Sequence, residues 1–461
     1  MTATDPTTDE TAVAWHLRGN RAPVSDELTL TELEVRGSIP TELDGRYVRN
    51  GANPRTGQSE HWFLGDGMVH GISLQGGKAE WYRNRYIRTP LYENPDVERM
   101  EIYLDLETLS FNYEVGTANT HVIGHAGKTL TLEEGCFPYE LTRELETVGP
   151  TNYDGKLVTA MTAHPKVCPD TGELLGFAYS SLPPYLTYIR VSAEGELLQS
   201  TPITVTGPTM MHDFVTTRNH SIFMDLPAVF DMELAMSGGM PIRWSDDYPA
   251  RFGIMPRDGG DADVRWFDVD PCYCFHTLNA YDDGDETVVH GCRVNEIWRD
   301  SADIGDPDVV SENEMPHMWE WRFNRATGAV SERQLDDRGT EFPRVPDAKV
   351  GNQHRYGYTM ALSALGSETV GEIFKYDMDN DGARTSHVFP TGQVPGEPVF
   401  VPAEGGTNED DGYLMTYVHD ETTDTSHLTI LDASDMAADP IAEVHLPRRI
   451  PTGFHGSWIA D

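Results

Sequence analysis

The stretch MMHDFVTTRNHSIFMDLP, residues 210–227, is typical of a β-hairpin, because two apolar, β-branched segments flank a polar turn at Arg218 and Asn219. Similar short alternating segments return along the chain, for example KLVTAMTAH (156–164), TVVHGCR (287–293) and GYLMTYVHD (412–420). Turn clusters such as PDTGE (169–173) separate them. Helical periodicity is confined to short pieces such as DMELAMS (231–237). The pattern predicts an all-β protein.

The number and spacing of the strands narrow the architecture. Strands that return every 8–12 residues over most of 461 residues, without a Pro/Gly/Ser-rich linker, fit a large propeller, paired sandwiches or a β-helix. A propeller suits a long run of antiparallel hairpins, but no repeat signature gives its blade number. We expect a flexible acidic N-terminus over residues 1–15 and a single β domain over residues 16–461.

The charge of the chain excludes several partners. It carries 34 basic and 75 acidic residues, a formal net charge of −41, which repels nucleic acid and anionic lipid. Lysine is much rarer than arginine, and this acidic, lysine-poor composition is typical of proteins from halophiles. The N-terminus does not resemble a signal peptide, and no apolar run reaches a membrane span. We therefore expect a cytoplasmic protein.

Two further patterns invite functional interpretations that their context does not support. DMDNDG (377–382) resembles the start of a calcium loop, but its flanks read as strands and Val388 stands where a glutamate is needed, so we interpret it as a hairpin turn. Cys272 and Cys274 have no second cysteine pair to complete a metal site, so we interpret them as small buried residues. Motifs of serine hydrolases, P-loop proteins and zincins are absent.

Four histidines stand out by their surroundings near strand ends. They are His164 in TAHPK, His212 in MMHDF, His276 in CFHTL and His455 in GFHGS. From the residues alone, any one of the 17 histidines is more often a hydrogen-bonded surface residue than a metal ligand. The pattern cannot say whether His212 or His220 of the opening hairpin does chemistry.

Longer motifs resolve this question by resemblance. GRYVRNGANP (45–54), HWFLGDGMVHG (61–71), AHPKVCPDTGEL (163–174) and MHDFVTT (211–217) resemble, in order, segments of the carotenoid cleavage oxygenase family. The order continues through FHTLNAY (275–281), EFPRV (341–345), GEPVFVP (396–402) and GFHGSW (453–458). The chain is therefore similar to a family that also contains lignostilbene-cleaving enzymes and a retinoid isomerase.

The resemblance implies a fold and a site. The fold is a seven-bladed β-propeller with a metal on its axis and short helices and loops over one face. One Fe²⁺ per subunit is bound by four histidines, and O₂ is the co-substrate. Three glutamates orient the histidines, and a threonine borders an open coordination position. Carried over motif by motif, the ligands are His164, His212, His276 and His455, the glutamates are Glu134, Glu341 and Glu397, and the threonine is Thr120.

The implied reaction is the cleavage of a conjugated C=C bond of a carotenoid or apocarotenoid by O₂ to give carbonyl products. Lignostilbene-cleaving members have a lysine just before the first glutamate, where this chain has Glu133, which disfavours a phenolic stilbene. Stilbene cleavage, a non-oxidative isomerase or hydrolase, and a non-catalytic lipid-binding propeller stay open. We also expect peripheral contact with the inner membrane face through residues 226–244, around Val229, Phe230, Leu234, Met236 and Met240.

Overall fold

The computed structural model describes residues 13–97, 99–105, 107–108, 110–236, 240–299, 312–362 and 371–461. Most of the predicted flexible N-terminus, residues 1–12, lies outside these ranges. Trp15, at its predicted end, begins a short 3-10 helix (Trp15–Leu17), and its ring packs edge-on against Trp62, with ring centroids 5.9 Å apart. The extent of a single domain over residues 16–461 stays a prediction.

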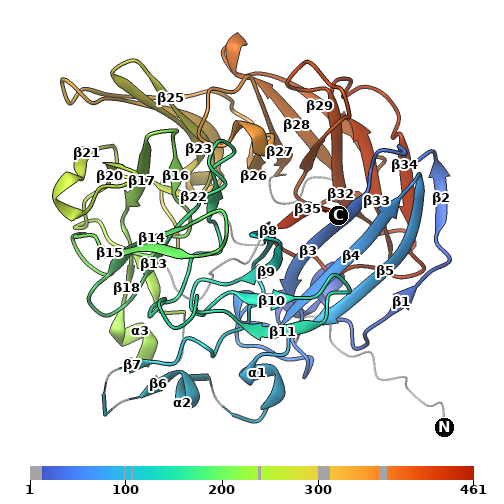
Figure 1. Ribbon diagram of the computed structural model, residues 1–461, viewed down its shortest axis with the longest axis horizontal. Helices are drawn as coiled ribbons and strands as arrows, with labels where there is room; N and C mark the ends of the chain where they lie inside the picture. Colours follow the sequence, from blue (N-terminus) through green and yellow to red (C-terminus); the bar gives the residue numbers. More distant parts are fainter. Residues whose placement is uncertain are drawn as a thin grey trace, which may run out of the picture.

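Seven antiparallel sheets form the blades of a β-propeller, as predicted (Figure 1). In order across each sheet, the first four blades contain β1 (Thr29–Leu30), β5 (Lys78–Tyr86), β4 (Gly67–Gln75), β3 (Gly45–Ala52) and β35 (Gly456–Ala460); β11 (Thr147–Pro150), β10 (Tyr139–Leu141), β9 (Lys128–Leu132) and β8 (His121–His125); β12 (Lys166–Val167), β13 (Leu174–Tyr179), β14 (Leu186–Val191) and β15 (Leu197–Pro202); and β16 (Val215–Thr216), β17 (His220–Asp225), β20 (Arg251–Pro256) and β21 (Arg265–Asp268).

The other three blades follow the same antiparallel plan. They contain β22 (Tyr273–Asp283), β23 (Glu286–Val294), β24 (His317–Asn324) and β25 (Val330–Gln334); β26 (Thr340–Arg344), β27 (Tyr356–Ala361), β28 (Glu372–Asp377) and β29 (Ala383–Val388); and β2 (Glu34–Gly37), β34 (Ala442–His445), β33 (Thr425–Asp432), β32 (Gly412–Asp420) and β30 (Gln393–Pro395), with β31 (Val399–Pro402) also paired to β32.

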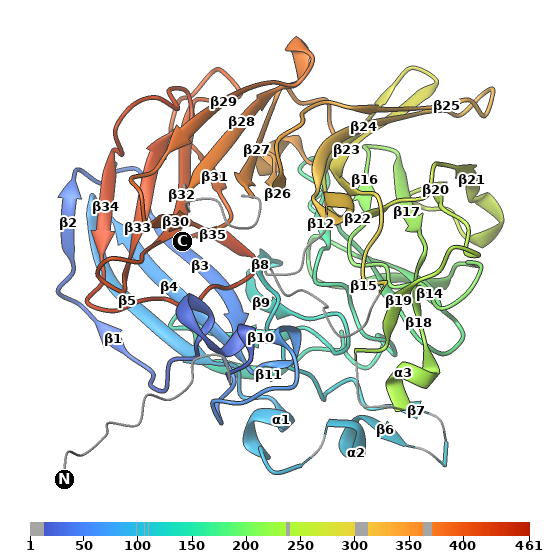
Figure 2. The same ribbon diagram turned by 180° about the vertical axis from the view of Figure 1, so that it is seen from behind.

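Short elements outside the blades gather on one side of the ring in both views (Figures 1 and 2). They are the helices α1 (Pro90–Glu93), α2 (Arg99–Tyr103) and α3 (Met232–Met236) and the two-stranded pairs β6 (Leu104–Asp105) with β7 (Ser110–Phe111) and β18 (Ala228–Phe230) with β19 (Ile242–Trp244). Within the described ranges, no helix is long and apolar enough to cross a membrane.

The two ends of the chain close the ring. β35 pairs with β3 in the first blade, with Arg49 opposite Gly456, and β2 pairs with β34 in the last blade. Gly51 and Gly453 let the segment before β35 approach β3 closely, because a Cβ on Gly51 would lie 2.8 Å from the Gly453 Cα. This closure brings His455 to the centre of the ring.

The predicted turns and cysteines are confirmed. The opening hairpin is formed by β16 and β17, with Val215 opposite Ile222, and DMDNDG is the turn between β28 and β29, with Asp381 at φ 53°. All five cysteines are unpaired and buried. The core fills the spaces between neighbouring blades; for example, Phe252 of β20 packs against Trp321 of β24, with ring centroids 5.4 Å apart.

Candidate metal centre

The four histidines singled out from the sequence come together at the inner ends of four blades. Three of them lie within three residues before an inner strand: His164 before β12, His212 before β16 and His455 before β35. The fourth, His276, lies within β22. One ligand atom from each ring lies within 4.8 Å of the others, which fits a metal site. His164 and His455 are 5% and 4% exposed, so the cluster is largely removed from solvent.

A break in the strand pairing directs His276 into the cluster. The pairing of β22 with β23 shifts its register between Cys274 and Thr277, so the residues between them leave the regular ladder. Irregularities of this kind bend a strand and re-aim a side chain. The local distortion of β22 therefore turns an imidazole from a regular strand position toward the ring axis.

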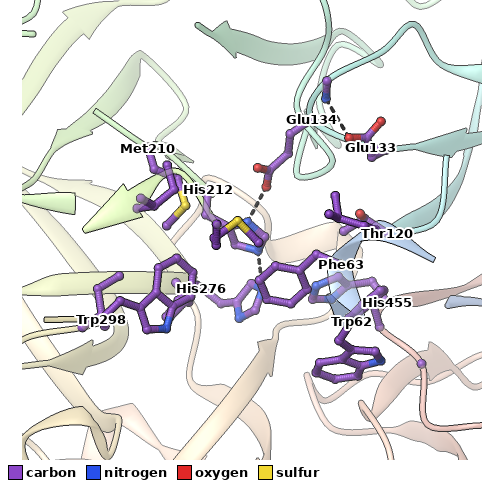
Figure 3. Close-up of a pocket in the computed structure, with 18 of the residues that line it drawn as sticks. Trp62, Phe63, Thr120, Glu133, Glu134, Met210, His212, His276, Trp298 and His455 are labelled. Atoms are coloured by element: carbon purple, nitrogen blue, oxygen red, sulfur yellow. Dashed lines mark hydrogen bonds and ion pairs between the residues drawn. The ribbon is translucent and has the colours of Figure 1, made fainter. Parts of the chain in front are cut away.

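Carboxylates anchor three of the four imidazoles through Nδ1. His276 Nδ1 lies 2.6 Å from Glu341 Oε2, and His455 Nδ1 lies 2.9 Å from Glu397 Oε1. His212 Nδ1 forms a close ion-pair contact with Glu134 (Figure 3). A carboxylate acceptor keeps the proton of a neutral imidazole on Nδ1 and leaves a lone pair on Nε2. The three glutamates thus fix which nitrogen faces the centre.

The facing nitrogens need a cation between them. His212 Nε2 lies 3.0 Å from His164 Nε2 and 3.1 Å from His276 Nε2. Burial first, and then the neighbouring imidazoles, lower the pKa of His164 and His455 well below the usual range, so both rings are neutral. Burial also lowers the pKa of His276, but the neighbouring Glu341 carboxylate outweighs it and leaves that pKa raised. When the proton of each ring is on Nδ1, the Nε2 lone pairs face one another at these separations and repel unless a metal ion binds them. The donor set therefore fits a metal ion.

The spacing also indicates a coordination geometry. Two nitrogens at right angles, each about 2.1 Å from a metal, would be about 3.0 Å apart, whereas tetrahedral neighbours would be about 3.4 Å apart. The observed separations of 3.0 and 3.1 Å agree with right angles. The four imidazoles would hold a metal ion and would leave room on it for other ligands.

A cavity of about 1400 Å³ adjoins the histidines. Thr120, Glu134 and three of the histidines line it, and Thr120 Oγ1 donates to Asn119 Oδ1 at 3.0 Å. Figure 3 shows Phe63 and Trp298 beside the cluster. The volume exceeds the range of about 300–1,000 Å³ that is usual for small-molecule sites, which indicates an elongated or bulky ligand. Its apolar wall includes Trp62, Phe63, Met210, Phe275, Trp298 and Phe454.

Comparison with known proteins agrees with this geometry. The sequence model described as retinal pigment epithelial membrane protein (RPE65) matches residues 21–460. A Mycobacterium tuberculosis protein named carotenoid cleavage oxygenase is 38% identical, and the match covers 96% of this chain and 97% of that protein. The chain belongs to the carotenoid cleavage oxygenase family. This membership confirms the resemblance seen in the motifs.

Other similar proteins include a carotenoid dioxygenase and a lignostilbene dioxygenase. A Crocus sativus carotenoid 9,10(9',10')-cleavage dioxygenase is 37% identical, with 98% of this chain and 90% of that protein covered. The crystal structure of the Pseudomonas brassicacearum lignostilbene dioxygenase superimposes with a TM-score of 0.87 at 28% identity, covering 97% of this chain and 99% of that one. Likeness of fold alone therefore does not separate polyene from stilbene substrates.

Several cavity and support residues were not identified from the sequence. Tyr179 contacts Glu134 through its hydroxyl, Arg344 Nη1 donates to Glu397 Oε2 at 3.3 Å, and the His121 ring centroid lies 5.2 Å from that of His455. Arg344 lies within the quoted EFPRV motif, but the motif did not indicate its hydrogen bond with Glu397. Tyr179 lies outside the quoted motifs, whereas His121 directly follows Thr120 in GTANTHV (116–122), where only the threonine was given a role.

Glu133 requires a correction to the argument about substrate charge. From the sequence, its carboxylate disfavours a phenolate in the cavity. In the structure, Arg99 Nη2 lies 3.3 Å from Glu133 Oε1, and both side chains line the cavity beside Tyr103. The arginine balances the charge of the carboxylate, so Glu133 does not act as an isolated anion. Its charge no longer discriminates between members of the carotenoid cleavage oxygenase family.

Proposed function

We propose that this protein is a non-haem Fe(II)-dependent dioxygenase that cleaves a conjugated C=C bond of a carotenoid or apocarotenoid. One observation carries the proposal: a four-imidazole cluster, three of whose rings contact carboxylates, opens on a large apolar cavity. The names of the relatives, which are carotenoid cleavage oxygenases and dioxygenases, support the choice of substrate class.

In this proposal one Fe²⁺ per subunit is held by His164, His212, His276 and His455. Imidazole is a suitable ligand for Fe(II), and four neutral donors leave the full charge of the ion available. The bound iron supplies the activation of O₂, the co-substrate. The positioning residues are Glu134, Glu341 and Glu397, which keep Nδ1 protonated and Nε2 free to bind.

The chain's own contribution to the reaction is binding, orientation and the exclusion of water. The apolar wall binds the polyene and keeps water from the reacting bond. Thr120 borders the open side of the centre and restricts what reaches it. In the overall reaction the C=C bond breaks and each of its carbons receives one oxygen atom of O₂, which gives two carbonyl products.

Two observations favour a polyene over a stilbene. The cavity is larger than usual small-molecule sites, and a protein named carotenoid cleavage oxygenase is 38% identical over nearly the whole chain, compared with 28% for the lignostilbene dioxygenase. An extended, rigid polyene fills such a cavity better than a two-ring stilbene does. The charge of Glu133, which Arg99 balances, does not favour either substrate.

We also propose that the protein touches the inner membrane face around the cavity entrance. Met232 and Met236 of α3 are 62% and 86% exposed, and Met100 of α2 is 57% exposed. Met100 and Met232 line the cavity as well, as do Phe230 and Met240 of the predicted contact segment. Exposed apolar side chains beside the opening of an apolar cavity suit the withdrawal of a lipid-soluble substrate from a bilayer.

The test is anaerobic loading of the metal-free protein with Fe(II), followed by air and a panel of carotenoids, apocarotenoids and stilbenes. We expect iron-dependent formation of two carbonyl products from a polyene, located by their masses, and slower or no cleavage of stilbenes. Products without added oxygen would instead support an isomerase or hydrolase. Polyene binding without any product would support a lipid-binding propeller.

A further inference from the structure

One buried carboxylate joins three of the segments that carry the histidine cluster. Asp213, next to His212, is 1% exposed. Its Oδ1 accepts hydrogen bonds from Lys166 Nζ and from the Phe214 backbone N–H, both at 2.8 Å. Its Oδ2 accepts from the Thr277 backbone N–H at 2.8 Å and from Thr277 Oγ1 at 2.7 Å. Every oxygen of this carboxylate is therefore bound by two donors.

The partners of Asp213 lie directly beside other members of the cluster. Lys166 follows His164 by two residues at the start of β12, and Thr277 follows His276 at the distorted part of β22. β12, β16 and β22 belong to three different sheets, so no strand ladder sets the distances between these segments. The side chain of Asp213 supplies a connection that the backbone pairing lacks.

A general stabilising role explains this arrangement poorly. An ion pair taken out of water loses hydration that its mutual attraction barely offsets, and apolar residues of similar size often serve stability as well or better. Buried ionic groups are better at selecting one arrangement of the parts they join. Here the parts joined are the backbones of three residues whose imidazoles must meet at one point.

We propose that Lys166, Asp213 and Thr277 form a positioning unit that sets the spacing of the His164, His212 and His276 imidazoles and so determines metal affinity. The inference rests on the metal site of the proposed function. None of the three residues lines the cavity, so the unit acts through the histidines and not on the substrate.

The direct test is Asp213→Asn, measured by titration of the metal-free protein with Co(II) alone. Asparagine keeps the shape but presents an NH₂ group to Lys166 or to the donors of Thr277, which breaks one side of the unit. We expect Co(II) affinity to fall about 10- to 100-fold, as is usual when groups behind metal ligands are lost. The visible absorption bands of bound Co(II) should shift, because the angles between the nitrogens change.

A second buried pair provides the matched control. Lys375 of β28 donates to Asp410 Oδ2 at 2.6 Å, its side chain is 8% exposed, and neither residue lines the cavity. We expect Asp410→Asn and Asp213→Asn both to lower the melting temperature of the metal-free protein. Asp410→Asn should leave Co(II) affinity and the Co(II) spectrum unchanged. An equal loss of affinity in Asp410→Asn would overturn the proposal, because general destabilisation would then explain both.

A milder variant keeps the test valid if Asp213→Asn does not fold. Thr277→Val removes one hydrogen bond to Asp213 and keeps the backbone N–H contact, so we expect a few-fold loss of Co(II) affinity that Thr277→Ser restores. Folded variants with the affinity and spectrum of the unmodified protein would refute the positioning unit alone. An unmodified protein that binds no Co(II) would refute the metal site itself.

Discussion

His212 and His220 of the opening hairpin each contact a carboxylate through Nδ1, but the surroundings of their second ring nitrogen differ. His212 contacts Glu134 through Nδ1 and faces His164 and His276 through Nε2. His220 Nδ1 lies 3.0 Å from Asp282 Oδ1, and no second imidazole meets its ring among the described residues. The difference supports the proposal that His212 is a metal ligand and that His220 has a structural role.

His212→Ala and His220→Ala therefore form a matched pair. We expect His212→Ala to lower metal affinity more than about 100-fold and to abolish turnover, because losing a ligand costs more than losing the group behind it. His220→Ala should keep its iron and its activity and lose only stability. Iron per subunit after dialysis and the rate of polyene cleavage distinguish the two; full iron in His212→Ala would contradict the assignment.

How far the site could be predicted depends on the kind of signal. His164, His212, His276 and His455 were found because each lies in a long motif, and the structure brings them together. Spacing alone did not separate His212 from His220, because ligands from four blades have no common sequence interval. Tyr179, His121 and the pairing of Arg99 with Glu133 were missed, since contacts between distant segments leave no local pattern.

At the scale of elements, Asp282 at the end of β22 ties the turn of the opening hairpin to the next blade. It accepts hydrogen bonds from Thr217 Oγ1 at 2.8 Å, Asn219 Nδ2 at 2.9 Å and Arg325 Nη1 at 3.0 Å, besides its contact with His220. Burial alone would raise the pKa of Asp282, but the hydrogen bonds from His220, Thr217 and Asn219 lower it to about 2.

Asp282→Asn should therefore destabilise the protein in a pH-dependent way. Near pH 7 we expect a loss of roughly 1–3 kcal/mol, the usual cost of leaving buried polar partners unsatisfied. A carboxyl with a depressed pKa stabilises the fold above its unfolded value of about 4, and this contribution disappears as the pH falls toward about 2. Melting temperatures of both proteins across this range test it; a constant difference would contradict the ionic role of Asp282.

Elements were predicted better than their assembly. Alternation and turn residues identified the β16–β17 hairpin and the turn at DMDNDG, because both depend on neighbouring residues. The register shift in β22 and the close approach of Gly51 to Gly453 depend on segments far apart in sequence, and no local rule indicates them. These are the features that direct His276 and His455 to the centre.

At the scale of the whole molecule, the blade number came from the resemblance and not from periodicity. Closure requires β35 to pair with β3 and β2 to pair with β34, across nearly the full length of the chain. Pairing between such distant strands is invisible in the local pattern. The net charge of −41 is also a property of the whole molecule. The halophilic source that it indicates stays a prediction.

This charge and the exposed methionines together predict how the protein meets a membrane. We expect sedimentation with neutral lipid vesicles, and with anionic vesicles only when molar salt shortens the screening length to about 3 Å. Met236→Ser should weaken binding roughly 10- to 150-fold, because burying a methionine contributes about 1.5–3 kcal/mol. The control is Val388→Ser. Val388 lies on β29, is 56% exposed and is not part of the cavity wall. Equal effects of both variants would refute the entrance contact.

The most direct test of the central claim is the fate of oxygen during turnover. The iron-loaded protein is given a polyene substrate under ¹⁸O₂, and the products are trapped by rapid reduction before their carbonyl oxygens exchange with water. A dioxygenase at the four-histidine centre predicts one ¹⁸O atom in each of the two products, and no products from His212→Ala. Products that carry oxygen only from water, or cleavage that persists without iron, would contradict the account.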